Sequence, residues 1–165
     1  MNKYLILCVD DEREILDCVL HDLARFESHF ILEGAQSVHE AKSIIAECAE
    51  DGIELALILC DHIMPGETGI DFLIELSEST ATQDTRKVLL TGQAGLEETV
   101  EAVNHASLDF YLSKPWDGEA LCNIITAQLS QYVISHDSQL LSWVSILDSE
   151  AILNAAAKNR TNFSD

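Results

Sequence analysis

Polar residues capable of chemistry follow several short apolar runs of this sequence, each just after the run ends. Two adjacent acids, Asp10 and Asp11, follow the first run, and Asp61 follows the third. Thr91 follows the fourth run, and Lys114 comes shortly after the fifth. If the runs are parallel strands of one sheet, their carboxyl ends meet at one edge. Three carboxylates, a hydroxyl group and an ammonium group would then converge there.

This combination of groups suits phosphoryl transfer assisted by a divalent cation. Three neighbouring carboxylates repel one another unless a cation lies between them, and hard oxygen ligands favour Mg²⁺. A carboxylate such as Asp61 can itself attack phosphorus and form an aspartyl phosphate. Because phosphoryl transfer is catalysed mainly by positioning and charge stabilisation, Lys114 and the Thr91 hydroxyl are suited to contact the phosphoryl oxygens. Considered singly, the acids admit a plainer explanation as a favourable helix start or loop cap.

Five apolar runs must supply the sheet that positions these groups. The two longest runs are apolar throughout, which is typical of parallel strands covered on both faces. Between the runs, apolar residues recur three and four positions apart, as in amphipathic helices. This alternation predicts an α/β fold with a parallel five-stranded sheet between two layers of helices. The predicted strands are Tyr4–Val9, Phe30–Leu32, Leu55–Cys60, Val88–Leu90 and Phe110–Leu112.

Local signals mark where some of the helices begin. The pattern Ser37-x-x-Glu40 is a capping box, in which the serine and the glutamate satisfy free backbone N–H groups of the first turn. Asp117 is predicted to cap the last helix of the sheet domain in a similar way. Apolar stripes predict helices through Ile15 to Leu23, Val38 to Cys48, Leu96 to Val103 and Leu121 to Leu129.

The core pattern ends near residue 131, which predicts a domain of residues 1–131 and a helical extension of residues 132–165. The extension is too short and too acidic for a helix-turn-helix DNA-binding domain, and its last residues are expected to be frayed. Its apolar stripe must be buried against the first domain or against a second copy of the chain, so a homodimer is one hypothesis. Residues 136–157 look helical, with Leu140, Leu141, Val144, Leu147 and Ala151 on one side.

The composition argues against several kinds of partner and location. The chain has 29 acidic residues against nine lysines and arginines, which gives a formal net charge of −20. This charge repels nucleic acid and anionic lipid, so direct binding to either is not expected. Five cysteines without a C-x-x-C pair predict free thiols in a reducing compartment. The sequence has no signal peptide and no apolar stretch approaching ~20 residues, so we expect a cytoplasmic protein.

Four motifs in unbroken order resemble the receiver domain of two-component response regulators. They are V-D-D-E, D-H-I-M-P-G-x-x-G, L-L-T-G and F-Y-L-S-K-P-W, and the resemblance covers residues 3 to about 131. Thr91 lies 30 residues after Asp61, and Lys114 lies 23 residues after Thr91, as is usual in the family. The resemblance implies a flavodoxin-like, doubly wound (βα)5 fold with a C-terminal helical extension.

The resemblance also implies a cofactor and the residues that bind it. Asp61 corresponds to the phosphoacceptor. Asp11 corresponds to the acid that binds Mg²⁺ directly, and Asp10 to its neighbour, which acts largely through water. Ile63, two residues after the acceptor, would provide Mg²⁺ with its backbone carbonyl group.

Three further residues correspond to the parts that respond to phosphorylation. Thr91 matches the switch hydroxyl, and Lys114 matches the lysine that pairs with the phosphoryl group. Tyr111 matches the aromatic residue that turns inward when the hydroxyl moves, although an ordinary core aromatic is the alternative. The Lys114–Pro115 peptide is expected to be cis, as in the family. Trp116 replaces the more common phenylalanine after the proline.

The implied function is a signalling switch rather than an enzyme. A sensor histidine kinase or a phosphotransfer protein would phosphorylate Asp61, and a downstream effector protein would read the altered surface. A phosphohydrolase with an aspartate nucleophile usually has a second aspartate two residues later, where this chain has Ile63. A phosphorylation-independent adaptor is the other alternative. The six histidines show no metal-ligand spacing, and His62 is expected to face solvent.

Overall fold

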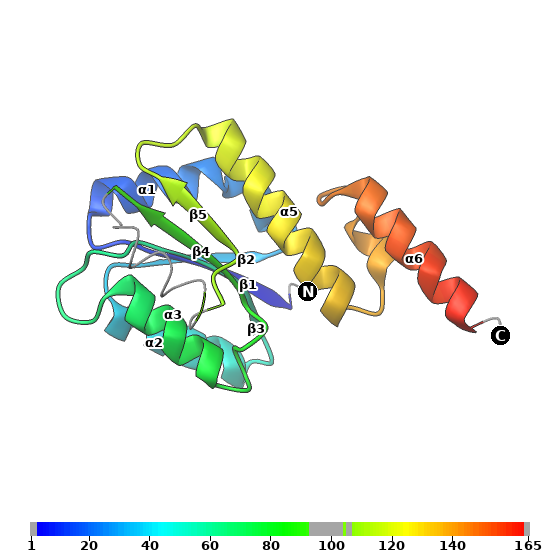
Figure 1. The fold of residues 1–165 in the computed structure, drawn as a ribbon, viewed down its shortest axis with the longest axis horizontal. Helices are drawn as coiled ribbons and strands as arrows, with labels where there is room; N and C mark the ends of the chain where they lie inside the picture. Colours follow the sequence, from blue (N-terminus) through cyan, green and yellow to red (C-terminus); the bar gives the residue numbers. More distant parts are fainter. Residues whose placement is uncertain (1–2, 93–103, 105–106, 164–165) are drawn as a thin grey trace.

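Five parallel strands form one sheet in the computed structural model, which describes residues 3–92, 104 and 107–163. The strands are β1 (Tyr4–Val9), β2 (Ile31–Ala35), β3 (Glu54–Cys60), β4 (Arg86–Thr91) and β5 (Phe110–Ser113). Their order is β2-β1-β3-β4-β5, and all neighbouring pairs are parallel (Figure 1). The direction of winding reverses between β1 and β3, so a crevice for a functional site is expected at the carboxyl ends of these two strands.

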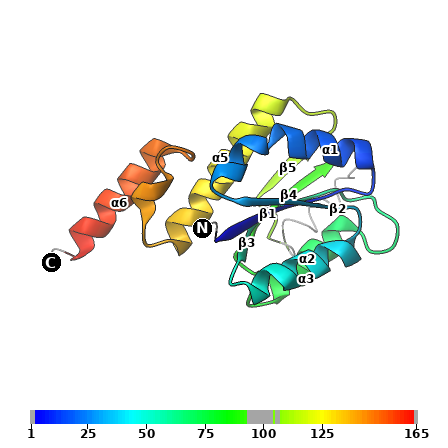
Figure 2. The ribbon, with the colours of Figure 1, turned by 180° about the vertical axis from the view of Figure 1, so that it is seen from behind.

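Helices cover both faces of the sheet, as Figures 1 and 2 show. One face is covered by α1 (Arg13–Asp22) and α5 (Gly118–His136), and the other by α2 (Val38–Glu50) and α3 (Gly69–Glu78). All six residues of β1 are buried and alternate between the two hydrophobic clusters, which is why this strand is apolar throughout. Among the described residues, no helix has the length and apolar character needed to cross a bilayer.

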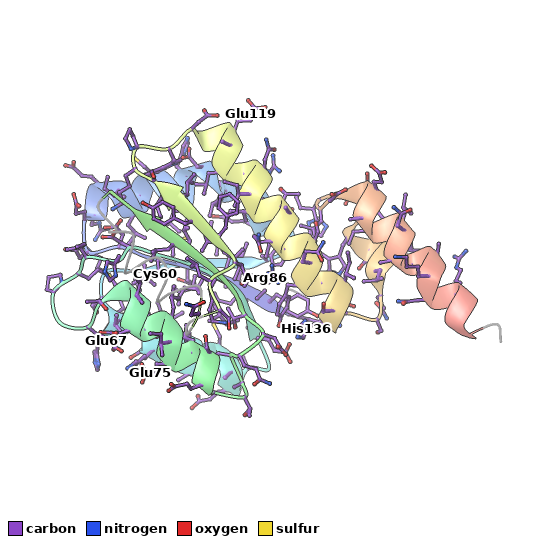
Figure 3. The ribbon with its side chains drawn as sticks, in the orientation of Figure 1. Cys60, Glu67, Glu75, Arg86, Glu119 and His136 are labelled. Atoms are coloured by element: carbon purple, nitrogen blue, oxygen red, sulfur yellow. The ribbon has the colours of Figure 1, made fainter. Side chains whose placement is uncertain are left out.

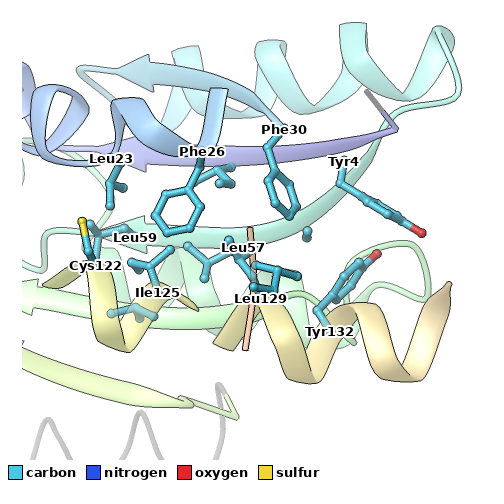
Figure 4. Close-up of a cluster of buried hydrophobic side chains, with 14 of the residues drawn as sticks. Tyr4, Leu23, Phe26, Phe30, Leu57, Leu59, Cys122, Ile125, Leu129 and Tyr132 are labelled. Carbon is cyan, nitrogen blue, oxygen red and sulfur yellow. The ribbon is translucent and has the colours of Figure 1, made fainter. Parts of the chain in front are cut away.

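The larger hydrophobic cluster lies between the sheet and the α1–α5 layer (Figure 4). A short 3-10 helix, η1 (Ala24–Ser28), follows α1 and brings Phe26 and then Phe30 into the interior. Both rings are almost fully buried and face Ile125 and Leu129 of α5 in Figure 4. Full burial of an aromatic side chain contributes about 1.5–3 kcal/mol, so this layer is a major source of stability.

The predicted helix caps are confirmed where the structure describes them. Ser37 Oγ accepts a hydrogen bond from the Glu40 N–H at 3.1 Å, and the Glu40 carboxylate accepts one from the Gln36 N–H at 3.0 Å. The Asp117 carboxylate accepts one from the Ala120 N–H at 3.2 Å, at the start of α5. The helix predicted through Leu96 to Val103 lies outside the described residues.

Residues 136–157, which were predicted to look helical, are helical in part but do not form one continuous helix. Helix α5 ends at His136, a 3-10 helix η2 covers Leu140–Trp143, and α6 begins at Ser149. Asp137 causes the first break, because it has extended backbone angles and its side chain accepts a hydrogen bond from the Gln139 N–H at 2.8 Å. Helix α6 runs to Phe163, through residues expected to be frayed. The boundary predicted at residue 131 falls inside α5 and stays a prediction.

The extension packs against the amino-terminal end of the sheet. The Trp143 ring lies 5.1 Å from the Phe30 ring and 5.8 Å from the Tyr4 ring, measured between centroids. Asp137 accepts hydrogen bonds from the Tyr4 hydroxyl at 3.2 Å and from Trp143 Nε1 at 3.1 Å. We call these four residues the amino-end cluster. Leu140 and Leu147 of the predicted apolar side are therefore buried against the sheet domain, but Leu141, which was predicted on the same side, is 53% exposed because η2 turns it outward. The homodimer stays a hypothesis.

Candidate functional site

The three predicted metal-binding acids lie together at the carboxyl ends of β1 and β3. One carboxylate oxygen from each of Asp10, Asp11 and Asp61 lies within 4.8 Å of the others. Val9 and Cys60, the last residues of the two strands, are partners in the sheet register, so the following residues emerge side by side. The Asp61 N–H donates to the Val9 carbonyl at 2.9 Å and extends this pairing. Figure 3 labels Cys60 at this end of the sheet.

Lys114 is the cation of this group. Its Nζ donates to Asp10 Oδ2 at 2.9 Å and lies 3.4 Å from Asp61 Oδ1. The Lys114 side chain is 16% exposed and those of Asp10 and Asp61 are 5% and 6% exposed, so their charges interact largely away from bulk water. The Lys114–Pro115 peptide is cis, as predicted. We call Asp10, Asp11, Asp61 and Lys114 the acidic site.

Burial and neighbouring charges shift the ionisation of the acidic site. Burial raises the pKa of Asp61, and although the Lys114 charge lowers this pKa, the net direction is upward. Burial lowers the pKa of Lys114, but the hydrogen bond to Asp10 and the charge of Asp61 outweigh it, and the net direction is also upward. The cluster thus holds three carboxylates and one ammonium group, which contacts two of them, and a divalent cation would neutralise the excess of negative charge. The hard oxygen donors fit Mg²⁺.

The loop after Asp61 is folded back against the end of β3. A Cβ atom on Gly69 would lie 2.0 Å from the Asp61 carbonyl oxygen, which no side chain tolerates. The Gly69 N–H donates to the His62 carbonyl at 2.8 Å and closes the loop. Gly66 has a φ of 87°, in the left-handed region that favours glycine. Both glycines of the D-H-I-M-P-G-x-x-G motif are therefore required for α3 to begin beside the acceptor.

The same loop explains a wrong prediction for His62. This residue was expected to face solvent, but it is only 5% exposed. Its Nδ1 accepts a hydrogen bond from the Ile70 N–H at 3.4 Å, in the first turn of α3, where backbone N–H groups have no partner within the helix. The return of the chain at Gly69 encloses His62, a long-range effect that its sequence neighbours do not reveal. Ile63, the next residue, is 58% exposed.

The remaining predicted site residues are placed by the strands that carry them. Thr91 is the last residue of β4 and pairs with Ser113 in the β4–β5 register, but its side chain lies outside the described part of the structure. Tyr111 pairs with Leu89, and its half-buried side chain packs against the hydrophobic cluster on the α2–α3 face. The roles of Thr91, Tyr111 and the Ile63 carbonyl stay predictions.

Sequence reasoning missed one hydrogen bond beside the acidic site. Trp116 Nε1 donates to Asp22 Oδ2 at 2.7 Å. A partly buried indole N–H usually has a partner, so Trp116 alone signalled that an acceptor lay nearby. The identity of the acceptor was hidden because the chain has 29 acidic residues and Asp22 is 94 positions away.

Comparison with known families agrees with this site. The family described as the response regulator receiver domain matches residues 6–126, well over half of the chain. The chain therefore belongs to the receiver-domain family of two-component systems.

Two curated relatives contain a similar region. The hydrogenase transcriptional regulatory protein HoxA of Cupriavidus necator is 28% identical over 120 residues, which is 73% of this chain and 23% of HoxA. The transcriptional regulatory protein CpxR of Klebsiella pneumoniae is 32% identical over 139 residues, which is 84% of this chain and 54% of CpxR. The chain thus spans about a quarter and about half of the lengths of these two proteins.

A solved structure supports the fold. The CheY-like response regulator receiver domain protein of Methanospirillum hungatei superimposes with a TM-score of 0.67 at 27% identity, covering 80% of this chain and 97% of that one. The predicted flavodoxin-like parallel sheet with a C-terminal helix is confirmed.

Proposed function

We propose that this chain is a switch that is phosphorylated on Asp61, with Mg²⁺, by a sensor histidine kinase or a phosphotransfer protein. The observation that carries the proposal is the close grouping of Asp61 with Asp10, Asp11 and Lys114 in a chain of the receiver family. In the reaction, the P–N bond of a donor phosphohistidine breaks and a new O–P bond forms at the Asp61 carboxylate.

Each residue of the acidic site has a part in this transfer. Asp10, Asp11, Asp61 and the Ile63 carbonyl would hold Mg²⁺, which when bound neutralises charge on the phosphoryl oxygens. Lys114 already lies 3.4 Å from Asp61 Oδ1, so its ammonium group is placed to pair with a phosphoryl oxygen. Asp10 fixes that ammonium group through its 2.9 Å hydrogen bond. The Thr91 hydroxyl is proposed to donate to another phosphoryl oxygen.

The output of the switch is a changed protein surface. Thr91 at the end of β4 and Tyr111 within β5 are proposed to shift on phosphorylation and alter what binds near β5 and α5. The net charge of −20 favours a partner with a basic surface and disfavours direct contact with nucleic acid. The cysteines of the described chain are free thiols, consistent with a reducing, cytoplasmic location. Because Ile63 replaces a second aspartate, we propose no turnover of external substrates.

Intact-mass analysis after incubation with acetyl phosphate and Mg²⁺ tests the proposal. We expect one phosphoryl adduct on the wild type that requires Mg²⁺ and is absent from Asp61→Asn. Asp51→Asn is the matched control, because Asp51 is an exposed aspartate at the end of α2 and should not affect the adduct. If the wild type shows no adduct and binds no beryllofluoride, the chain is instead a phosphorylation-independent adaptor.

A further inference from the structure

Lys114 stands on a short segment that joins β5 to α5. Ser113 is the last residue paired to β4, and α5 begins at Gly118, so residues 114–117 lie between the two elements. The Lys114 side chain is long and flexible and carries about 2 kcal/mol of rotamer entropy. The position of its ammonium group therefore depends on how firmly this segment is held.

The Asp22–Trp116 hydrogen bond connects the segment of residues 114–117 to the end of α1. At 2.7 Å it is at the short end of the range for N–H···O bonds, and the carboxylate acceptor strengthens it. A groove of about 670 Å³ runs beside Trp116 and Lys114, so neighbouring side chains do not enclose the indole on that side. Trp116, two residues after Lys114, is thus held by packing of its ring against the larger hydrophobic cluster and by a hydrogen bond from its indole N–H to Asp22.

Asp22 is itself fixed by two neighbouring helices. It is the last residue of α1, and its carbonyl accepts a hydrogen bond from Cys122 Sγ of α5 at 3.0 Å. A Cβ atom on Gly118 would lie 3.2 Å from Asp22 Oδ1, so the carboxylate lies against the first residue of α5. The amino-terminal end of a helix stabilises a negative charge, which favours this placement.

The other end of α1 is attached to the acidic site. Asp10 Oδ1 accepts a hydrogen bond from the Glu12 N–H at 2.9 Å, immediately before α1 begins. Helix α1 therefore connects Asp10 at its start to Trp116 at its end, through Asp22. Lys114 donates a hydrogen bond to Asp10 directly and is linked to α1 through Trp116 and Asp22, so these contacts form a closed ring that includes Lys114, the residue that contacts the acceptor Asp61.

From this ring we infer that Asp22 and Trp116 are positioning residues for the phosphorylation of Asp61, acting through Lys114. The inference rests on the proposed function. Phosphoryl transfer depends strongly on the placement of charged groups, and a displacement of about 1 Å can cost up to ~100-fold in rate. Loss of the Asp22–Trp116 hydrogen bond releases the segment that carries Lys114 and lowers the rate without removing any group that contacts phosphate.

The test measures the rate of Asp61 phosphorylation by acetyl phosphate with Mg²⁺ in a set of variants. Trp116→Phe removes the indole N–H but keeps an aromatic ring, and Asp22→Ala removes the acceptor. We expect each to lower the rate by about three- to tenfold. Asp22→Asn keeps an oxygen acceptor and should remain within about twofold of the wild type. Asp17→Ala, an exposed aspartate on the same helix beside the same groove, is the matched control.

A double-mutant cycle with Lys114→Ala separates positioning from general support of the fold. If Trp116 acts through Lys114, Trp116→Phe should have no further effect on the rate in the Lys114→Ala background. Equal rates for wild type and Trp116→Phe, or an undiminished effect without Lys114, would overturn the inference. If Asp22→Ala fails to fold, the phosphorylation rate of Trp116→Phe alone tests whether the hydrogen bond positions Lys114. Absence of any adduct on the wild type would instead contradict the proposed function itself.

Discussion

The two ends of strand β1 use aspartate in opposite ways. At the amino-terminal end, the single carboxylate of Asp137 accepts hydrogen bonds from two neutral donors, Tyr4 and Trp143. At the carboxyl-terminal end, Asp10 and Asp61 lie side by side with Lys114 as the shared cation. The first arrangement satisfies a partly buried charge, whereas the second concentrates charges that repel one another.

This difference separates the source of stability from the source of reactivity. The amino-end cluster combines tilted aromatic rings with satisfied hydrogen bonds, which stabilise the fold. The acidic site is held in place by the sheet register and by the loop that returns at Gly69, although its own charges oppose its formation. We therefore expect mutations at the two ends to move stability in opposite directions.

Trp143→Ala should have the largest effect on stability. The substitution removes a ring that is 7% exposed and packs against Phe30 and Tyr4, so the free energy of unfolding should fall by about 3–5 kcal/mol. Urea unfolding followed by far-UV circular dichroism measures this change. Leu141→Ala, at a neighbouring residue that is 53% exposed, is the control and should change little. Similar losses in the two variants would show that the extension contributes no specific packing.

High pH should destabilise the amino-terminal end of the sheet through Tyr4 of the amino-end cluster and through its neighbour Tyr132, whose ring centroid lies 5.4 Å from that of Tyr4. Burial, followed by the charge and hydrogen bond of Asp137, raises the pKa of Tyr4, and burial followed by the Glu54 charge raises that of Tyr132. Above about pH 10 the unfolded chain releases protons that the folded chain keeps, so the free energy of unfolding falls as the pH rises. Each tyrosine contributes a slope of up to about 1.4 kcal/mol per pH unit.

Comparing Tyr4→Phe with the wild type isolates one of these slopes. Tyr4→Phe should be less stable at neutral pH, by about 1 kcal/mol for the lost hydrogen bond, but its stability should fall less steeply above pH 10. Denaturant unfolding at a series of pH values from 8 to about 11 measures both effects. Parallel curves for the two proteins would mean that Tyr4 titrates alike in the folded and unfolded chains.

Asp61→Asn should have the smallest effect, and in the opposite direction. Without a divalent cation, the substitution removes one of three clustered carboxylates, so stability at neutral pH should rise by about 1 kcal/mol. The raised pKa of Asp61 has the same sign, because its ionised form is less favourable in the folded chain than in the unfolded chain. Thermal unfolding with and without Mg²⁺ measures this, and Mg²⁺ should stabilise the wild type more than the variant.

Asp51→Asn serves as the control for this comparison too. It removes an exposed carboxylate far from the acidic site and should leave both the stability and the response to Mg²⁺ unchanged. A less stable Asp61→Asn protein would show that the three carboxylates do not oppose folding.

The sequence predicted the central strands well because burial on both faces leaves a continuous apolar run. The predicted Tyr4–Val9 matches β1, and Leu55–Cys60 differs from β3 by one residue. The edge strand β2 extends to Ala35, beyond the predicted end at Leu32. The prediction stopped early because Glu33 and Gly34 interrupt the apolar pattern, which an edge strand, with a neighbour on one side of the sheet, does not need to keep. Apolar patterning thus predicts which residues are buried, and it predicts the boundaries of a strand only where the whole strand is buried.

The grouping of Asp10 with Asp61 was predictable because they follow two strands predicted from apolar runs, and the register of those strands brings the two residues together. Contacts between segments that are far apart in the sequence were not predictable. His62 is enclosed by a loop that closes at Gly69, and Asp22 meets Trp116 across 94 positions. Asp137 ends a helix that apolar periodicity alone would continue. The first two misses involve contacts between distant segments, whereas the third involves a local hydrogen bond from the Gln139 N–H to Asp137 that apolar periodicity does not report.

The chain has two tryptophans, and each donates its indole N–H to an aspartate, Trp116 to Asp22 at the end of α1 and Trp143 to Asp137 after α5. Trp116 lies two residues from Lys114, while Trp143 lies among the rings of the amino-end cluster. Replacing one tryptophan by phenylalanine therefore leaves a single intrinsic fluorophore that reports on one of these two regions only. The molecule carries its own pair of optical probes, one for the chemistry and one for the integrity of the fold.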